Sequence, residues 1–276
     1  MIPRLTLNDA TTIPQLGYGL FRVDPDQAER RVAEALEIGY RHIDTAHIYG
    51  NEEAVGRAIA SSGVSRDELY VTTKLWNDRH EDADNALKES LEKLALDRVD
   101  LYLIHWPRPG LNKYVQAWES LIELRAQGLT TSIGVSNFQL PHLAKLESET
   151  DVTPAVNQVE LHPLFQRWKE LDAMRVHGSL IEGWAPLGGG FYKLQDYPEI
   201  TDAAENHGVT PAQVVLRWHI QNNIIVFPKT NSPERMRENF DIFNFELSDE
   251  EMTRIISLDE EEFGRQGPHP DEFEKV

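Results

Sequence analysis

The chain has 276 residues, of which 40% are hydrophobic and 26% charged, as expected of one large globular domain with a sizeable core. Its formal net charge is −19, from 27 basic and 46 acidic residues, and this charge argues against nucleic acid or an anionic membrane as a partner. Cysteine is absent, which excludes disulfides, thiolate nucleophiles and cysteine-ligated metals.

The first half of the sequence alternates short apolar runs with longer amphipathic stretches. It begins with two short strands, 5–7 and 12–14, joined by a hairpin turn at Asn8 and Asp9. Pro25 and Gly39 are typical start and stop residues for the first helix. The predicted strands after the hairpin are 17–20, 42–44, 69–73 and 99–104, and the predicted helices are 25–39, 52–61, 82–94 and 114–126.

The second half continues the alternation. The predicted strands are 131–135, 155–159, 180–184 and 224–227, and the helices that follow them are 141–147, 168–176, 211–221 and 233–242. Two helices are additional to this pattern, 200–206 and 249–257, the second with Ser248 as its N-cap. The tail from Gly264 is expected to be irregular.

Eight strand and helix units in alternation predict a parallel sheet, and eight is the number that closes a barrel. An open doubly wound sheet is the alternative, but it usually carries G-x-G-x-x-G after its first strand. Gly17 and Gly19 are not followed by a third glycine. The sequence therefore predicts an α/β fold with one domain over residues 1–276. We expect a (β/α)8 TIM barrel with an N-terminal β-hairpin and two extra helices.

Polar or aromatic residues recur where the predicted strands end, which is where α/β barrels carry their chemistry. Tyr49 lies in the loop after the second barrel strand. The residues at the strand ends are Asp44, Lys74, His105, Ser136, Asn137, Gln158, Trp184 and Lys229.

Asp, Tyr, Lys and His together indicate proton transfer. A Lys ammonium about 4 Å from a Tyr contributes roughly 4 kcal/mol at an effective dielectric near 20. We therefore expect Lys74 to lower the pKa of Tyr49 by up to about three units, and Asp44 to pair with Lys74. His105 can hydrogen-bond a substrate oxygen. Proton donation to a developing alkoxide is what carbonyl reduction requires.

Each of these residues, taken alone, also has a purely structural explanation. Asp44 could cap a helix, Tyr49 could be a packed aromatic residue, and His105 could be a core histidine. Trp76 and Trp106 could simply fill space. Their joint occurrence at one end of the predicted barrel favours a reactive site.

Several segments resemble the signatures of the aldo-keto reductases, and the resemblance covers essentially the whole chain. The sequence is most similar to the short bacterial members, the 2,5-diketo-D-gluconate reductases. The matching segments are 39–46 (GYRHIDTA), 49–52 (YGNE), 74–76 (KLW), 105–107 (HWP), 133–138 (IGVSNF) and 228–230 (PKT), with Arg235, Glu238 and Asn239.

The resemblance implies an NADPH-dependent carbonyl reductase and a role for each matching residue. The implied catalytic tetrad is Asp44, Tyr49, Lys74 and His105. The implied nicotinamide contacts are Ser136, Asn137, Gln158 and Trp184. The implied pyrophosphate contacts are Leu187, Gly188 and Gly189, followed by Gly190. The implied contacts to the 2′-phosphate and adenine are Lys229, Thr230, Arg235, Glu238 and Asn239. The implied substrate contacts are Phe21, Trp76 and Trp106.

The implied phosphate site agrees with the chemistry of its residues. Lys and Arg suit a phosphate dianion, and the helix beginning near Pro233 offers its positive end to an anion. Such a basic cluster is the local exception that the acidic net charge requires. His47 lies inside the first signature, either facing the substrate pocket or as a solvated loop residue. His162 is expected to be structural, and no metal site is predicted.

Two other functions remain open. A metal-dependent hydrolase on the same barrel would need clustered His and Asp ligands, and Lys74 beside Asp44 would weaken metal binding. A non-catalytic NADPH-binding module would not need the intact tetrad. We expect a cytoplasmic protein, because the N-terminus lacks a signal-peptide pattern and no run is long enough for a membrane span. The resemblance to the aldo-keto reductases implies a monomer. The brief polar stretch 107–113 favours small polar carbonyls such as keto-sugar acids, including 2,5-diketo-D-gluconate.

Overall fold

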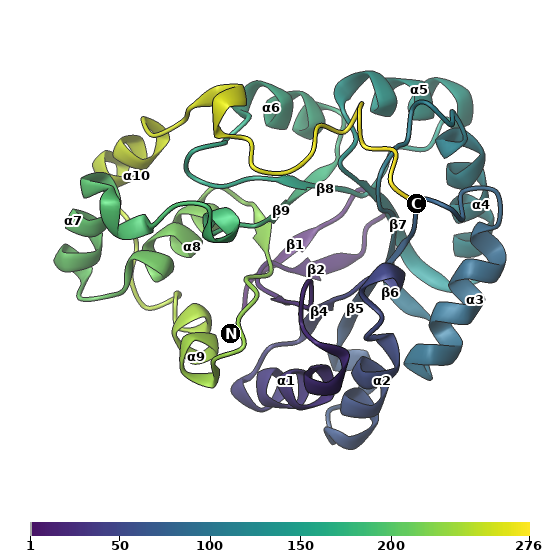
Figure 1. Ribbon diagram of the computed structural model, residues 1–276, viewed down its shortest axis with the longest axis horizontal. Helices are drawn as coiled ribbons and strands as arrows, with labels where there is room; N and C mark the ends of the chain where they lie inside the picture. The colour runs from purple at the N-terminus through teal and green to yellow at the C-terminus, as the bar shows by residue number, and fades with distance from the viewer. Residues whose placement is uncertain (1) are drawn as a thin grey trace.

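The computed structural model describes residues 2–276. Eight parallel strands, ordered β3 to β10, form a sheet surrounded by helices (Figure 1). The sheet closes where the chain before β3 meets β10. There Leu16 bridges Val226, Gly17 N donates to Val226 O at 2.8 Å, and Val226 N donates to Gln15 O at 3.0 Å. The prediction of a (β/α)8 barrel is therefore confirmed.

The strands and their helices alternate as predicted, and their ends differ from the predicted ranges by a few residues. The barrel strands are β3 (Tyr18–Gly19), β4 (His42–Asp44), β5 (Tyr70–Leu75), β6 (Val99–Ile104), β7 (Thr130–Ser136), β8 (Val156–Glu160), β9 (Leu180–Trp184) and β10 (Ile225–Val226). The helices that follow them are α1 (Pro25–Ile38), α2 (Glu52–Ser61), α3 (Ala83–Leu94), α4 (Tyr114–Ala126), α5 (Leu140–Thr150), α6 (Trp168–Val176), α8 (Pro211–Gln221) and α9 (Pro233–Phe240).

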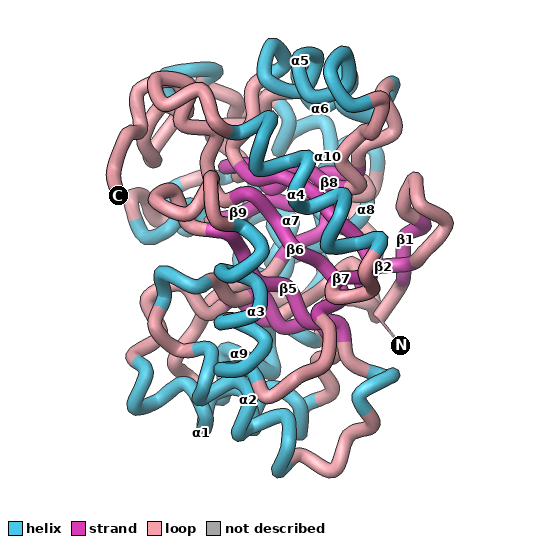
Figure 2. Tube along the Cα trace, turned by 90° about the vertical axis from the view of Figure 1, so that its right-hand side faces the viewer, coloured by secondary structure: helices cyan, strands magenta, loops and turns pink. Residues whose placement is uncertain are grey.

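The N-terminal hairpin, β1 (Arg4–Thr6) and β2 (Thr12–Pro14), closes the amino-terminal end of the barrel. Its strands pair antiparallel, with Leu5 opposite Ile13. Leu7 and Ile13 are buried in the same apolar cluster as Leu101 and Val156 from the strands. The hairpin and the C-terminus lie at opposite ends of the molecule (Figure 2). The predicted hairpin is confirmed.

The two extra helices, α7 (Pro198–His207) and α10 (Asp249–Ile256), pack against each other. His207 bonds Glu251 at 3.0 Å and Arg254 bonds Asp202 at 2.7 Å. Ser248 caps α10 in a capping box with Glu251, as its sequence position predicts. After the short turn η5 (Glu261–Gly264), the irregular tail crosses the barrel (Figure 1).

Side chains alternate between the inside and the outside of the barrel along each strand, and this alternation places the site. In β5, Tyr70 belongs to the apolar cluster near the hairpin, whereas Lys74 lies four residues further on, near the carboxyl end. The inside of the barrel is therefore apolar at one end and polar at the other. Within residues 2–276, every helix is too short or too polar to span a bilayer.

Candidate active site

Lys74 and Asp44 form a buried ion pair at the carboxyl ends of neighbouring strands. Lys74 Nζ lies 2.7 Å from Asp44 Oδ1 and also donates to Thr45 O at 2.8 Å. In the pairing of β4 with β5, Asp44 is the register partner of Thr72, and Lys74 lies two residues beyond Thr72 on the same face of the strand. Burial raises the pKa of Asp44, and the Lys74 ammonium opposes this shift without cancelling it.

Tyr49 ends the turn η1 (His47–Tyr49) directly above this pair. Lys74 Nζ lies 5.3 Å from the centre of the Tyr49 ring, and the His105 ring lies 5.8 Å from it. Burial, and then the Asp44 carboxylate, raise the pKa of Tyr49 well above that of free tyrosine. The expectation of a lowered Tyr49 pKa was wrong, because burial is the largest cause of the shift and the Asp44 carboxylate adds to it.

His105 follows β6 and faces Tyr49 and Trp76. Its ring lies 5.1 Å from that of Trp76. Burial, and then the charge of Lys74, lower the pKa of His105 well below its ordinary value. Its imidazole is therefore neutral near pH 7 and can donate only one hydrogen bond. Asn137 holds the backbone of His105 through Nδ2 to His105 O at 3.0 Å.

Aromatic side chains surround this group of polar residues. Phe21 contacts Tyr49 with ring centres 5.4 Å apart and remains half exposed. Trp76 and Trp106 are buried, and the C-terminal tail adds Phe273, whose ring lies 4.3 Å from Trp106 and 6.4 Å from Trp76. Sequence reasoning missed Phe273, since nothing in the irregular tail signals where it packs.

The tail is held over the barrel by polar contacts at both of its ends. Glu274 pairs with Arg108 at 3.1 Å, and Asn77 donates to Lys275 O at 2.8 Å. Nearer its start, the backbone of Gly267 donates to the buried Glu160 carboxylate at 3.0 Å. Together these contacts place Phe273 as a third aromatic wall beside the two tryptophans.

The residues implied to hold a nicotinamide form one hydrogen-bonded group. Trp184 Nε1 donates to Asn137 Oδ1 at 2.8 Å, and Ser136 Oγ donates to Gln158 O at 2.9 Å. Asn137 has a left-handed backbone with φ 65, which the short Asn side chain tolerates better than most. Leu187, three residues after Trp184, leads into η3 (Gly188–Gly190). The glycines of this turn have positive φ, and a side chain at Gly188 would meet the Tyr192 ring.

The predicted phosphate-binding residues form a basic cluster without acidic partners. Lys229 and Arg235 are exposed, and no ion pair within residues 2–276 involves either of them or Arg22. Partial burial, then the charges of Arg22 and Arg235, lower the pKa of Lys229. Arg22 extends the cluster from the loop after β3. Sequence reasoning missed Arg22, although it directly follows Phe21.

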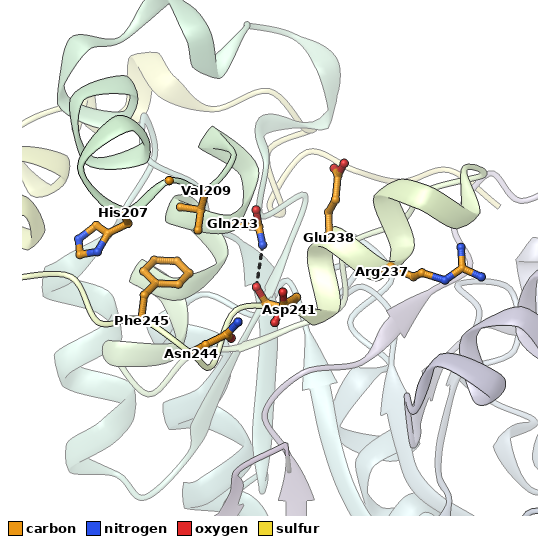
Figure 3. A pocket seen from close by; sticks show the side chains of 9 residues that line it. His207, Val209, Gln213, Arg237, Glu238, Asp241, Asn244 and Phe245 are labelled. Atoms are coloured by element: carbon orange, nitrogen blue, oxygen red, sulfur yellow. Dashed lines mark hydrogen bonds between the residues drawn. The ribbon is translucent and has the colours of Figure 1, made fainter.

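The cluster lies at the amino end of α9. Ser232 caps this helix by accepting from Arg235 N at 3.2 Å, and Thr230 Oγ1 accepts from Ser232 N at 3.1 Å. Asn239 is buried. Glu238 lines a surface hollow of about 560 Å³ between α7, α8 and α9. His207 and Phe245 line the side of this hollow that lies opposite Glu238 (Figure 3).

This hollow contains none of the four tetrad residues, and neither does a second one of about 640 Å³ beside the N-terminal hairpin. The candidate site is therefore defined by the contacts of the tetrad residues with one another and with the aromatic side chains around them.

His47 lies in η1, two residues before Tyr49. Its Nδ1 is 3.8 Å from Glu52 Oε2, and its side chain is 24% exposed. The structure thus places His47 at the edge of the site, beside α2. Within residues 2–276, no group of three or more His, Asp or Glu side chains is arranged to hold a metal ion. His162 instead contacts Glu160 and Tyr192.

The carboxyl end of this α/β barrel carries a buried Lys–Asp pair, a tyrosine and a neutral histidine. These side chains are of the kind that catalyses proton transfer. Comparison with known proteins gives the family. The model of the Aldo/keto reductase family matches residues 15–260. The chain belongs to the aldo-keto reductase family, and the predicted resemblance is confirmed.

Similar proteins cover the chain almost completely. It is 47% identical over 270 residues to methylglyoxal reductase DkgA of Escherichia coli, covering 98% of this chain and 97% of that protein. It is 50% identical over 275 residues to an aldo-keto reductase of Mycolicibacterium smegmatis, covering 99% and 98%. A Gox0644 variant in complex with NADPH superposes with TM-score 0.94 at 41% identity over 99% of both chains. A Bombyx mori aldo-keto reductase in complex with NADP gives 0.89 at 34% identity over 96% and 94%.

Proposed function

We propose that this chain reduces small polar aldehydes and ketones with NADPH, using Tyr49 as the general acid. The observation that carries the proposal is the convergence of the buried Asp44, Lys74 and His105 on the partly buried Tyr49. The family is one of oxidoreductases, and this combination of side chains suits carbonyl reduction.

The residues present fit NADPH. In a chain with net charge −19, Arg22, Lys229 and Arg235 form a basic cluster beside a helix amino end. Such a cluster suits a phosphate dianion. Ser136, Asn137, Gln158 and Trp184 would hold the nicotinamide, Leu187 with the glycines of η3 the pyrophosphate, and Thr230, Glu238 and Asn239 the adenosine half. When bound, NADPH supplies the hydride.

Tyr49 keeps its proton throughout the neutral range because burial raises its pKa. It can still act as a donor, since an alkoxide that forms on the substrate is a stronger base than a phenolate. His105 is neutral and donates a hydrogen bond that orients the substrate oxygen. Lys74, fixed by Asp44, places positive charge beneath the Tyr49 ring and stabilises the phenolate as it forms.

Aromatic walls and a covering tail favour small substrates. Phe21, Trp76 and Trp106 line the site with Phe273 from the tail, and aromatic walls of this kind suit short carbonyl compounds. The name of the bacterial relatives, methylglyoxal reductase, supports the same size class. We also propose that His47 touches the substrate from the rim of the site and that the chain acts as a monomer.

The test is turnover of a carbonyl panel by the purified chain with NADPH. We expect the highest kcat/KM with methylglyoxal, short aldehydes and 2,5-diketo-D-gluconate, and activity that survives a chelator. Absence of any turnover together with tight NADPH binding would favour the non-catalytic binding module. A preference for steroid ketones would contradict the proposed substrate class, and loss of activity with the chelator would favour a metal-dependent enzyme.

A further inference from the structure

The side-chain amide of Gln158 lies between two carboxyl groups inside the barrel. Its Nε2 donates to Asp44 Oδ2 at 3.0 Å and to Glu182 Oε2 at 2.9 Å. Gln158 and Glu182 are register partners on β8 and β9, so their side chains leave the sheet at the same level. All three side chains are buried. Sequence reasoning identified Asp44 and Gln158 and missed Glu182.

This arrangement fixes which end of the amide faces the site. A carboxamide nitrogen carries two hydrogens, and here each is bonded to a different carboxyl group. The reversed amide would place its carbonyl oxygen against the Asp44 carboxylate oxygen and would lose that bond. The Gln158 oxygen Oε1 is therefore the part of the side chain that remains free to accept a hydrogen bond from a ligand.

β9 has the sequence LIEGW, and Glu182 is its one residue with an ionisable side chain. This side chain is fully buried. The titratable groups that face it are Asp44 from β4 and Lys74 and Tyr70 from β5. Burial, and then the Asp44 charge, raise the pKa of Glu182 to about 8. Near pH 7 Glu182 is therefore mostly protonated, and its charge does not compete with Asp44 for Lys74.

We propose that Glu182 is a positioning residue: with Asp44, it orients the Gln158 amide so that Oε1 accepts a hydrogen bond from the nicotinamide carboxamide NH₂ group. The inference rests on the proposed function, because it assumes that the nicotinamide binds beside Gln158. It explains why a strand that is otherwise apolar carries a buried carboxyl group. An apolar residue there would leave one hydrogen of the Gln158 amide buried and unpaired, which is costly, and Asp44 alone would then hold the amide in its orientation.

The test compares the affinity for NADP⁺ with that for its 3-acetylpyridine analogue, in which a methyl ketone replaces the carboxamide and no NH₂ group is present. Fluorescence or calorimetric titration gives both dissociation constants. The wild-type chain should bind NADP⁺ more tightly by roughly three- to tenfold, the range of one neutral hydrogen bond. Glu182→Leu should bring this ratio close to one by weakening NADP⁺ binding selectively. Glu182→Gln, which keeps an acceptor for Gln158, should retain the ratio.

Two controls separate positioning from general damage. Gln158→Leu should abolish the same preference, and adding Glu182→Leu to it should change the ratio no further. Tyr70→Phe removes the hydroxyl of another buried side chain of the barrel, which does not bond Gln158, and should keep the wild-type ratio. Glu182→Met repeats the test with a longer apolar side chain if Glu182→Leu does not fold.

The inference is overturned if the wild-type chain does not distinguish the two cofactors, or if Glu182→Leu or Glu182→Met weakens both equally. It is also overturned if the preference survives these substitutions. The proposed function fails in a different way: the wild-type chain would then bind neither cofactor, or would bind NADPH without reducing any carbonyl.

Discussion

The Lys74 ammonium and the Asp44 carboxylate lie 2.7 Å apart at a depth where the Lys74 side chain is fully buried. Two opposite charges at this depth stabilise each other, but each is costly without its partner. Asp44 also accepts from Gln158, so the pair links the proposed proton donor on one side to the proposed nicotinamide site on the other.

Replacement of Lys74 should therefore damage both activity and stability. Lys74→Met leaves the Asp44 charge buried and unpaired, which typically costs about 3–5 kcal/mol of unfolding free energy. Chemical denaturation of the variant measures this loss. The double variant Lys74→Met with Asp44→Asn removes both charges and should recover much of the stability without recovering kcat. Equal stability of the single and double variants would argue against the pair as described.

The basic cluster should set the preference for NADPH over NADH. Charged hydrogen bonds contribute about 1.5–3 kcal/mol each, so Lys229→Ala with Arg235→Ala should reduce the preference by tenfold or more. The change should lie mainly in cofactor affinity. Arg237→Ala, an exposed cation on the same helix, is the matched control and should leave the preference unchanged. Equal KM values for the two cofactors in the wild-type chain would contradict the proposed phosphate site.

His105 should act without gaining a charge in the neutral range. Since burial lowers its pKa well below the ordinary histidine value, kcat for carbonyl reduction should show no inflection near pH 6.5. His105→Gln keeps a hydrogen-bond donor and should reduce kcat less than Tyr49→Phe. The contrary result is a clear fall of kcat as pH decreases through 6.5 in the wild-type chain but not in His105→Gln. It would show that His105 becomes protonated in this range.

Glu182 should make the stability of the chain depend on pH. Its pKa is about 8 in the folded chain and about 4.5 when unfolded. Between these values the folded state holds a proton that the unfolded state has lost, so this contribution to stability falls as pH rises. The slope is about 1.4 kcal/mol per pH unit for one proton. Denaturant titrations from pH 5.5 to 7.5 should show the unfolding free energy of Glu182→Gln rising relative to that of the wild type at about this slope. Parallel plots of unfolding free energy against pH for the two proteins would contradict the prediction.

Much of this architecture could be predicted from the sequence because it depends on local patterns. The alternation of short apolar runs with amphipathic helices predicts the barrel. In such a barrel, residues that follow consecutive strands meet at one end. Asp44, Lys74 and His105 each lie at or directly after a strand, which is why sequence reasoning could group them with Tyr49 before any distance was known.

The parts that were not predicted depend on contacts between distant segments. Phe273 reaches Trp106 only because the tail crosses the barrel, and Arg22 joins Lys229 only because the chain before β3 closes against β10. The pKa of Tyr49 was predicted to shift in the wrong direction, since sequence gives the charge of Lys74 but not the extent of burial. Glu182 did carry a signal, as a lone carboxyl residue in a predicted buried strand.

The central claim is that the Tyr49 hydroxyl delivers the proton. Tyr49→Phe removes this hydroxyl and keeps the ring, so its packing against Phe21 and His105 should survive. NADPH affinity should change little, because the proposed cofactor contacts come mainly from the strand ends and loops of the second half of the barrel. General acid catalysis is typically worth about 10²–10⁴-fold.

The most direct measurement is the single-turnover rate of hydride transfer in Tyr49→Phe, with NADPH affinity measured on the same preparation. We predict a rate lower by at least about a hundredfold with nearly unchanged NADPH affinity. A variant that transfers hydride at close to the wild-type rate would contradict the assignment of Tyr49 as the general acid.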